Sequence, residues 1–454
     1  MFEWFNESVV SVLTPIMLLC FGLFFTFYLK LFYLRHPIKM MRSMLKRERG
    51  DGISPFRAVS LALAGTLGVG NIAGVASSIA IGGYGSVFWM WASALVAMVL
   101  KYAEIVLAIR HRRFDEQSGE YHGGASYYIS DRFSLRGKKR LGVFLGGVFA
   151  VLCIVNSVSM GCMIQAGAVS SSFSGVMGVR EWIVGAVIAV LCVAVITGNA
   201  KWIGGFCERT VPLMTVGYVL ISIAVIVMRW RDVPSAVAVI FSDAFKPQSA
   251  VGGVVGFLVS RQLKAGTMRG LMSNEAGCGT APTAHAAANT SSAAKQGFWG
   301  IFEVFVDTLL LCTLTAIVII LAGAEPLRFA GDPMMMAIKA YSAVLGDWCE
   351  YFMCVAVLLF AFATIVCWAH YGKESLRYLT GSRIAEVIYV LAFTVFVFLG
   401  AVAAPSYAWL FADLSIGIMT VINLPVLFSM RREIKDETEN FFAEEKNKIN
   451  EISR

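Results

Sequence analysis

The sequence predicts an all-α integral membrane protein, and three observations carry the prediction. Of its 454 residues, 57% are hydrophobic and 15% are charged, whereas a soluble domain has roughly 45–50% apolar and about 25% charged residues. The apolar residues form runs of about 20 or more, the length that a helix needs to cross a bilayer. Short segments rich in Lys and Arg separate these runs, which is the pattern that orients membrane helices. The net charge of +8 therefore reflects topology, and we expect no nucleic-acid partner.

Eleven runs are long and apolar enough to span a membrane. In order they are residues 9–33, 56–82, 86–109, 141–173, 182–198, 210–228, 250–287, 298–322, 347–371, 383–403 and 406–430. The first run has no basic start or cleavage pattern, so we interpret it as a retained helix. Residues 233–245 look amphipathic and are predicted to form an external surface helix.

The topology follows from the basic segments. The strongest, residues 36–51 and 110–140, come after the first and third runs. They lie on one side if every run spans, and the positive-inside rule makes that side cytoplasmic. We therefore expect the N-terminus outside and the charged tail, as a solvated helix or a disordered segment, in the cytoplasm. The expected division is an extracellular N-terminus with an extra transmembrane helix (1–35), a basic cytoplasmic loop (36–55), a ten-helix core (56–430) and the cytoplasmic tail (431–454).

A glycine cluster interrupts the second run. Gly65, Gly68 and Gly70 precede Asn71, and each Gly weakens a helix by roughly 1 kcal/mol. A break inside a membrane is tolerated only beside a cavity or other protein. It would expose amides for a carboxylate and carbonyls for a hard cation such as sodium. Close helix packing through small residues is the alternative, but the clustering and the Asn favour a site.

A second irregular run follows five core spans later. Residues 250–287 contain Arg261, Lys264, Arg269, Glu275 and seven glycines, which a lipid-facing helix could not carry cheaply. The candidate breaks are residues 252–256 and 273–279. Paired interrupted spans are typical of inverted-repeat transporters. The sequence therefore predicts a five-plus-five repeat with one extra N-terminal helix.

Long motifs in this chain resemble a known family. Residues 82–91 (GGYGSVFWMW), 101–104 (KYAE) and 269–279 (RGLMSNEAGCG) are similar to signatures of the sodium:alanine symporters, also called alanine or glycine:cation symporters. The resemblance runs from about residue 52 to 430. Further matching positions are Gly123, Gly124, Tyr127, Tyr128, Ala281, Pro282, Val306, Asp307, Thr308, Trp368, Tyr371 and Gly372. Residues 64–71 also resemble the first core helix of the neurotransmitter:sodium symporters.

The resemblance implies sodium-coupled uptake of a small neutral amino acid, alanine or glycine, by alternating access. It implies no enzyme activity and no cofactor, with sodium as a co-transported ligand. The implied substrate-binding residues are Thr66, Val69, Gly70, Asn71, Gln165, Asn274 and Trp368. The implied sodium ligands are the carbonyls of Ala64 and Leu67, with Asn71 and Thr364. The expected partners are the amino acid, sodium and membrane lipid, with the protein a monomer in the cell membrane, which is the inner membrane in a bacterium.

The chain departs from this family at three positions. Val69 stands where Thr is usual, Ala363 where Ser is frequent and His370 where Tyr is frequent. Because two of these changes remove hydroxyls beside the implied sites, a proton-coupled amino-acid symporter of the same fold is the first alternative. An ion channel is the alternative of another class, although no filter motif is visible. A membrane enzyme would need a catalytic set that the sequence lacks.

Several charged residues lie within or next to apolar runs. Lys101 and Glu104 are three apart and are expected to pair at the cytoplasmic boundary. Glu303 is interpreted as a wet packing or capping residue, and His370 as a solvated residue at a span end. Asp307 lies deeper, and an intramembrane carboxylate is a functional candidate by default.

Overall fold

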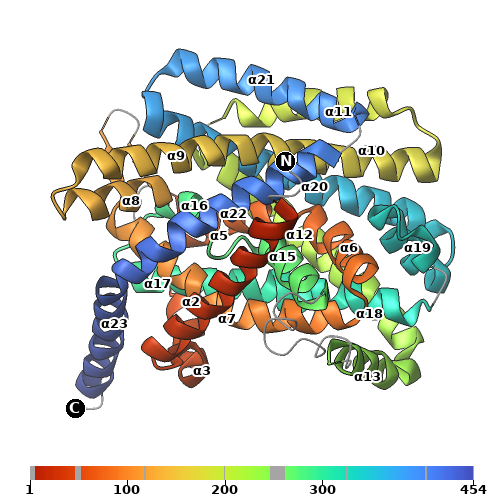
Figure 1. The fold of residues 1–454 in the computed structure, drawn as a ribbon, viewed down its shortest axis with the longest axis horizontal. Coiled ribbons are helices and arrows are strands. Elements are labelled where there is room, and N and C mark those ends of the chain that lie inside the picture. Colours follow the sequence, from red (N-terminus) through yellow and green to blue (C-terminus); the bar gives the residue numbers. More distant parts are fainter. Residues whose placement is uncertain are drawn as a thin grey trace.

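The computed structural model describes residues 6–46, 53–116, 119–198, 200–245, 261–323, 326–403 and 406–452. Its long helices run side by side across the view of Figure 1. The C-terminal helix α23 (Arg431–Ile452) lies at one end of the molecule, and α19 (Pro333–Leu345) and α13 (Val233–Ala244) lie at the other. We call these the α23 end and the α19 end. The prediction of a helical membrane protein is confirmed.

Eight helical segments in the described part of the chain are long and apolar enough to cross a membrane. They are Ser11–Tyr28 (α2), Gly85–Arg110 (α7), Lys139–Met177 (α9 and α10), Ala200–Met228 (α12), Ala293–Leu321 (α17 and α18), Trp348–Thr380 (α20), Arg383–Val402 (α21) and Tyr407–Ser429 (in α22, Ser406–Ser429). Shorter apolar helices are α6 (Ala73–Gly82), α11 (Glu181–Ile196) and α19. Among the eight candidate spans, α7 is the most deeply buried, and it packs along both α15 (Arg261–Asn274) and α17 (Ala293–Val304).

The glycine cluster breaks its helix as predicted. Helix α5 (Pro55–Thr66) begins at an N-cap, where the Ser54 hydroxyl accepts a hydrogen bond from the Arg57 amide, and ends at Thr66. A short 3-10 turn over Val69–Asn71 follows, and α6 begins at Ala73. A Cβ on Gly68 would lie 2.5 Å from Thr364 Oγ1. Glycine is required there because no side chain fits between the break and α20.

The second irregular run also breaks. Helix α15 ends at Asn274, Glu275 follows with φ 55°, and the chain re-enters a helix only at α16 (Pro282–Ala286). The two glycines in the turn, Gly277 and Gly279, have φ of 92° and 83°, a backbone region that favours glycine. Of the two candidate breaks, the one at residues 273–279 is present in the structure. The other candidate, residues 252–256, lies outside the described residues.

Two π-helical turns interrupt long spans. One, Ser159–Met163, joins α9 (Lys139–Val158) to α10 (Ile164–Met177). The other, Phe305–Cys312, joins α17 to α18 (Thr313–Leu321) and carries Asp307. Such turns are rare in proteins, and many of those that occur lie at functional sites.

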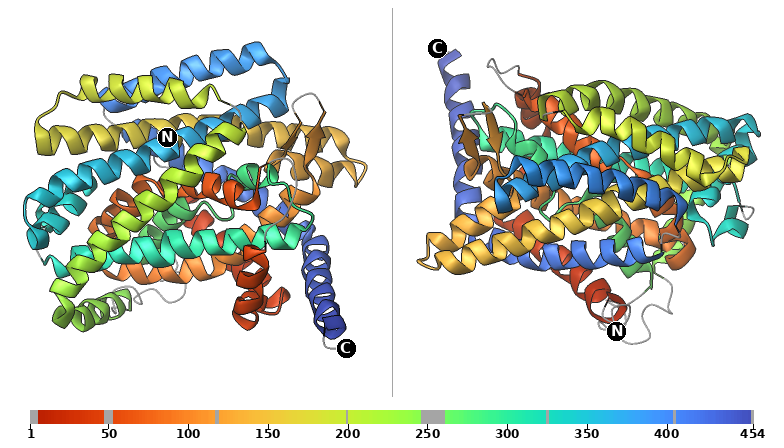
Figure 2. Two further views of the ribbon diagram at one scale, coloured as in Figure 1. Left: turned by 180° about the vertical axis from the view of Figure 1, so that it is seen from behind. Right: turned by 90° about the horizontal axis from the view of Figure 1, so that it is seen from above.

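The segments predicted as loops contain more structure than expected. The basic segment 110–140 holds the antiparallel hairpin of β1 (Arg113–Asp115) and β2 (Glu120–His122) and the helix α8 (Ala125–Ser134). Figure 2 shows the hairpin at the same end of the molecule as α23. The remaining short elements are η1 (Asn6–Val10), α3 (Phe32–Arg35), α4 (Pro37–Leu45), η4 (Trp230–Asp232) and η7 (Pro326–Phe329).

Some predicted boundaries were wrong. The first run stops being helical after Tyr28 because Lys30 and Leu31 have φ of 59° and 51°. Helix α12 begins at Ala200 rather than at residue 210, and α20 continues to Thr380. These two helices extend past the apolar stretch with polar residues, which hydropathy alone does not detect.

Three interpretations of charged residues were also wrong. Lys101 pairs with Glu303, at 3.0 Å between Nζ and Oε1, and not with Glu104. Glu303 is fully buried and not wet. His370 is only 3% exposed, because α20 runs past it for nearly three more turns.

Candidate functional site

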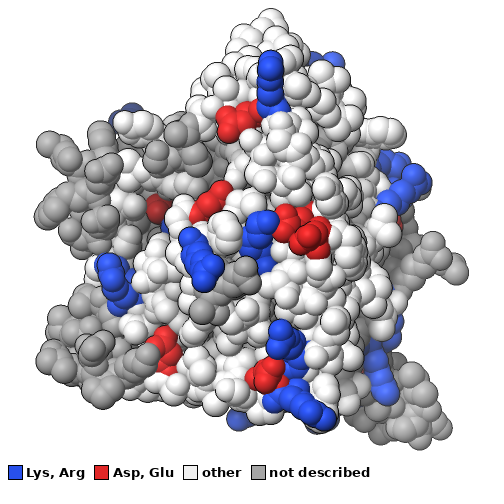
Figure 3. All heavy atoms as spheres, turned by 90° about the vertical axis from the view of Figure 1, so that its right-hand side faces the viewer, with Lys and Arg blue, Asp and Glu red and all other residues white. Residues whose placement is uncertain are grey.

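A cavity opens at the α19 end and leads toward the break between α5 and α6. Its volume is about 650 Å³, and its walls include Val69, Ser77, Ile164, Asp332 and Trp409. Figure 3 shows this end of the molecule, where charges of both signs are scattered over a largely uncharged surface. The described residues therefore form no large patch of one charge at this end.

A smaller pocket lies next to this cavity, directly against the break. Its volume is only about 20 Å³, which is close to the space that one water needs. Its lining residues are Gly70, Gly74, Met160, Ile164, Gln165, Arg269, Met272 and Trp409. Ile164, Arg269 and Trp409 line both spaces, so they form the wall between them.

An ion pair and a cation–π contact hold this wall in place. The Arg269 guanidinium of α15 lies 4.7 Å from the ring centre of Trp409 on α22. Its Nη1 is 3.7 Å from Oδ1 of Asp413, one helical turn further along α22. The wall therefore joins the second broken helix to α22, and it would open if these two helices moved apart.

The backbone of the first break is held by side chains from two other helices. Gln165 on α10 accepts a hydrogen bond from the Val69 amide through Oε1, at 3.0 Å, and donates through Nε2 to the Met160 carbonyl. The Thr364 hydroxyl on α20 donates to the Ala64 carbonyl at 2.9 Å. The structure thus brings Ala64, Val69, Gln165 and Thr364 together at the end of α5, and Gln165 also lines the small pocket.

A cluster rich in oxygen atoms surrounds Asn71. The Asn71 Nδ2 donates to Asp307 Oδ1 at 2.6 Å and to Ser273 Oγ at 3.1 Å. The hydroxyls of Ser273 and Thr308 donate to Asp307 Oδ2 at 2.9 and 2.7 Å. The Asn71 Oδ1 is buried and has no hydrogen-bond partner among the described residues. One carboxylate, one amide oxygen and two hydroxyls are ligands that suit a hard cation.

The sequence predicted Asn71 as a site residue, but it did not predict that Ser273 and Asp307 would be its hydrogen-bond partners. Asp307 was noted only as a buried carboxylate, and Ser273 and Thr308 only as parts of motifs. Ser273 lies at the end of a broken helix, and Asp307 and Thr308 lie in a π-helical turn. The sequence indicated the broken helix but not the π-helical turn.

The remaining predicted site residues lie away from the small pocket. The Thr66 hydroxyl faces the carbonyls of its own helix and Glu303 Oε1, at 3.4 Å. The Asn274 side chain donates to Thr308 and accepts from the Ala276 amide. Trp368 is fully buried against Gly161, where a Cβ would lie 2.3 Å from Trp368 Cβ. Leu67 is buried at the end of α5, with its amide bonded to the Leu63 carbonyl.

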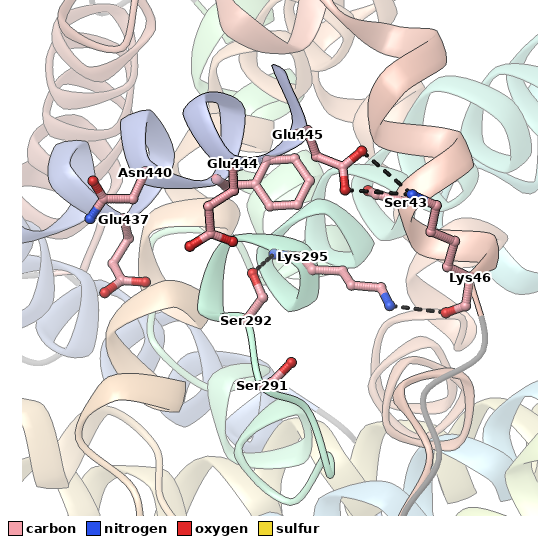
Figure 4. Close-up of a pocket in the computed structure, with 10 residues that line it drawn as sticks. Ser43, Lys46, Ser291, Ser292, Lys295, Glu437, Asn440, Glu444 and Glu445 are labelled. Carbon is pink, nitrogen blue, oxygen red and sulfur yellow. Dashed lines mark hydrogen bonds and ion pairs between the residues drawn. The ribbon is translucent and has the colours of Figure 1, made fainter. Parts of the chain in front are cut away.

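Another pocket lies at the α23 end and does not reach the break. It has a volume of about 400 Å³ between α4, the start of α17 and α23. Figure 4 shows Lys46 directed at Glu445, at 3.5 Å, and Lys295 at the Lys46 carbonyl, at 2.9 Å. Glu437 and Glu444 complete a wall of mixed charge. These contacts attach the C-terminal helix to the bundle.

A membrane-spanning helical bundle with two broken helices that end beside a small internal pocket is the architecture of a secondary transporter. The chain belongs to the sodium:alanine symporter family, whose model matches residues 1–454. That family consists of transporters rather than enzymes, and sodium is its co-transported ion and not a cofactor.

Two relatives support this assignment, and one solved structure shares the fold. The sodium/alanine symporter AgcS of Methanococcus maripaludis is 34% identical over 97% of this chain and 97% of its own. The amino-acid carrier protein AlsT of Bacillus subtilis is 34% identical over 89% of this chain and 84% of its own. The solved structure of a Na⁺-coupled sialic acid symporter superposes with a TM-score of 0.57 at 14% identity, covering 94% of this chain and 88% of that one. The last likeness concerns the fold alone.

Proposed function

We propose that this protein moves a small neutral amino acid, alanine or glycine, into the cell together with sodium by alternating access. The observation that carries the proposal is the first break. There Thr364 and Gln165, from two different helices, hold the ends of α5 and of the following turn beside a pocket of about 20 Å³. Membership of the family and similarity to amino-acid carriers support it.

The proposed sodium site lies at the carboxyl end of α5. The carbonyls of Ala64 and Leu67 and the Thr364 hydroxyl would provide its oxygen ligands. The end of a helix carries partial negative charge, and the Thr364 oxygen already lies 2.9 Å from the Ala64 carbonyl. We propose the cluster of Asn71 and Asp307 as a second cation site, because it presents a buried carboxylate and an amide oxygen without a partner.

The proposed substrate site is the small pocket. The amides of Val69 and Gly70, at the start of the second half-helix, would bind the substrate carboxylate. The Val69 amide is bonded to Gln165 Oε1, so Gln165 must turn aside as substrate binds. Met160, Met272 and Ile164 leave little space, and a larger side chain would clash with them. Thr66, Asn274 and Trp368 do not line this pocket, and we propose that they stabilise the helices around it.

We further propose eleven spans with a five-plus-five inverted repeat, in a protein that acts as a monomer in the cell membrane. The two breaks, in α5–α6 and in α15–α16, would be its related elements. The basic residues near α23, such as Lys30, Lys46 and Arg110, support a cytoplasmic position of the α23 end by the positive-inside rule. The cavity of about 650 Å³ would then face the outside, with the N-terminus on that side.

Uptake of radiolabelled alanine and glycine into proteoliposomes tests the proposal. An inward sodium gradient is compared with an inward proton gradient and with no gradient. We expect accumulation above the external concentration only with sodium. Accumulation driven by protons would instead establish the proton-coupled alternative and direct mutagenesis to Asp307, Glu303 and His370. Flux that equilibrates but never accumulates under either gradient would indicate a channel and contradict the proposal.

A further inference from the structure

The two broken helices end inside the molecule with different groups at their carboxyl ends. At the end of α5, the Ala64 carbonyl accepts a hydrogen bond from the neutral Thr364 hydroxyl. At the end of α15, the Asn274 carbonyl accepts one from the Lys101 ammonium, at 2.7 Å. Both ends carry the partial negative charge of exposed carbonyls. One end is therefore open to a mobile cation, whereas the other already faces a full positive charge.

The Lys101 side chain is buried between α7 and α17. Lys101 and Glu303 are both 0% exposed, with 3.0 Å between Nζ and Oε1. Helix α17 has a glycine where it crosses the lysine stem, since a Cβ on Gly300 would lie 3.0 Å from Lys101 Cγ and 2.3 Å from Ile105 Cδ1. A side chain at position 300 would have to displace the side chains of Ile105 and Lys101. The lysine is thus a built-in part of the packing between these helices.

The atoms around the ammonium are those that a sodium ion would use. They are a main-chain carbonyl of Asn274 and a carboxylate oxygen of Glu303, and the Thr66 hydroxyl lies 3.4 Å from that carboxylate oxygen. Carbonyl, carboxylate and hydroxyl oxygens are the usual ligands of hard cations. They come from α15, α17 and α5, so a cation here connects both broken helices to the rest of the bundle.

We propose that Lys101 is a tethered cation. Its ammonium permanently fills, at the end of α15, a position that a co-transported sodium ion would otherwise occupy. It therefore lowers by one the number of sodium ions moved with each amino acid. This inference rests on the proposed sodium-coupled function. It adds the residue that sets the ion stoichiometry.

The test is the ratio of sodium to alanine transported by Lys101→Ala. Removing the ammonium leaves the Glu303 carboxylate buried without its cation, and such a charge is strongly unfavourable until another cation replaces it. Dual-label uptake of radiolabelled sodium and alanine into proteoliposomes gives the ratio. We expect one more sodium ion per alanine than in the wild type, and a steeper dependence of uptake on sodium concentration. An unchanged ratio in a transporting K101A protein would overturn the proposal.

Two control variants separate this role from a general effect of removing a lysine. In the double variant K101M/E303Q the carboxylate is removed together with the ammonium, so we expect the wild-type ratio. Lys373→Ala is the matched control, because the Lys373 ammonium also caps main-chain carbonyls, those of Ile196 and Gly198 at 3.4 and 3.3 Å. Its removal should leave the ratio unchanged. An extra sodium ion in either control would contradict a site made by Glu303 and the end of α15.

Folding of the variant provides a second test. If K101A does not survive purification in potassium or choline chloride, the proposal predicts that sodium chloride rescues a monodisperse protein, because ion binding stabilises the folded state. Loss of the protein in all three salts would count against it. Wild-type uptake is measured first. Absence of sodium-driven accumulation there would reject the proposed function, and a melting temperature of K101A that does not rise with sodium would reject the tethered cation.

Discussion

Thr364 connects the end of the first broken helix to α20 through one hydroxyl. That hydroxyl donates to the Ala64 carbonyl at 2.9 Å and to the Phe360 carbonyl of its own helix at 3.1 Å. In the proposed site the same oxygen binds sodium. Thr364→Val keeps the shape and removes the ligand, and a polar interaction with a charged group is worth about 1.5–3 kcal/mol. We expect the sodium concentration for half-maximal uptake to rise about ten- to hundredfold.

The matched control for this variant is Thr394→Val. The Thr394 hydroxyl bonds only the Val390 carbonyl of its own helix, α21. It should leave sodium dependence unchanged. The alanine affinity of T364V at saturating sodium should also stay near the wild-type value. If T364V and T394V have the same sodium dependence, the hydroxyl does not bind the ion.

At the scale of elements, the wall between the outer cavity and the small pocket belongs to α15 and α22. Trp409→Ala would join the two spaces and remove the contact with Arg269. A cation–π contact is worth about 0.5–2 kcal/mol, so the closed form should lose about twofold to thirtyfold in population. We expect a sodium leak without alanine and a lower accumulation ratio. Uptake of radiolabelled sodium into proteoliposomes without alanine measures the leak.

Trp348→Ala is the comparison for this variant, because Trp348 is 56% exposed at the start of α20, packs against Phe352 and lines neither of the two spaces. It should show neither effect. If W409A shows no sodium leak and accumulates alanine as the wild type does, the wall residues do not close the pocket.

The docking of α23 depends on a histidine beyond the end of α7. His111 hydrogen-bonds Asp131 on α8 at 2.9 Å and Glu433 on α23 at 3.2 Å. Burial disfavours the charged imidazole, but the bonds and charges of these two carboxylates outweigh it and raise the pKa of His111 to about 9. The same contacts lower the pKa of Asp131 and of Glu433.

The sign of the pH effect follows from these shifts. A raised histidine pKa adds stability that is complete below the unfolded value of 6.5 and is lost as pH rises through about 9. The lowered carboxyl pKa values add stability that is lost as pH falls into the acid range. We expect His111→Phe to destabilise the protein by about 1–2 kcal/mol at pH 7, after allowance for partial exposure. The difference from wild type should vanish near pH 10, as measured by melting in detergent. A difference that persists there would exclude this ion pair.

At the scale of the whole molecule, the described conformation opens at the α19 end. Sodium between Ala64, Leu67 and Thr364 would tie α5 to α20 and favour this form. Ser77 lines the open cavity, so Ser77→Cys reports on it. Cys20 is exposed and the other nine cysteines are buried, so a C20S background is suitable.

The rate at which a membrane-impermeant thiol reagent labels this variant measures whether the cavity is open. We expect sodium alone to speed the reaction, and sodium with alanine to slow it as the cavity closes. Potassium in place of sodium is the control. Labelling that responds to neither ligand would mean that this cavity does not take part in the transport cycle.

The sequence predicts the parts of this architecture that depend on local chemistry. Clustered glycines such as Gly65, Gly68 and Gly70 weaken a helix, so the first break was predicted, whereas residues 273–279 were only one of two candidates for the second. Pairing across the chain was not found. Lys101 was assigned to Glu104 three residues away, whereas its partner Glu303 comes from a helix whose packing against α7 no local pattern shows. The hairpin β1–β2 and α19 were too short to be detected by hydropathy.

Equilibrium binding of radiolabelled alanine to the purified protein across sodium concentrations tests directly whether sodium and the amino acid share one site. If sodium and the amino acid share the site at the break of α5, each must raise the affinity for the other by the same factor. A shared site predicts tight alanine binding in sodium and weak binding in choline, and in T364V it predicts that about ten- to hundredfold more sodium is needed for tight alanine binding. Alanine affinity that is the same in sodium and in choline would contradict it.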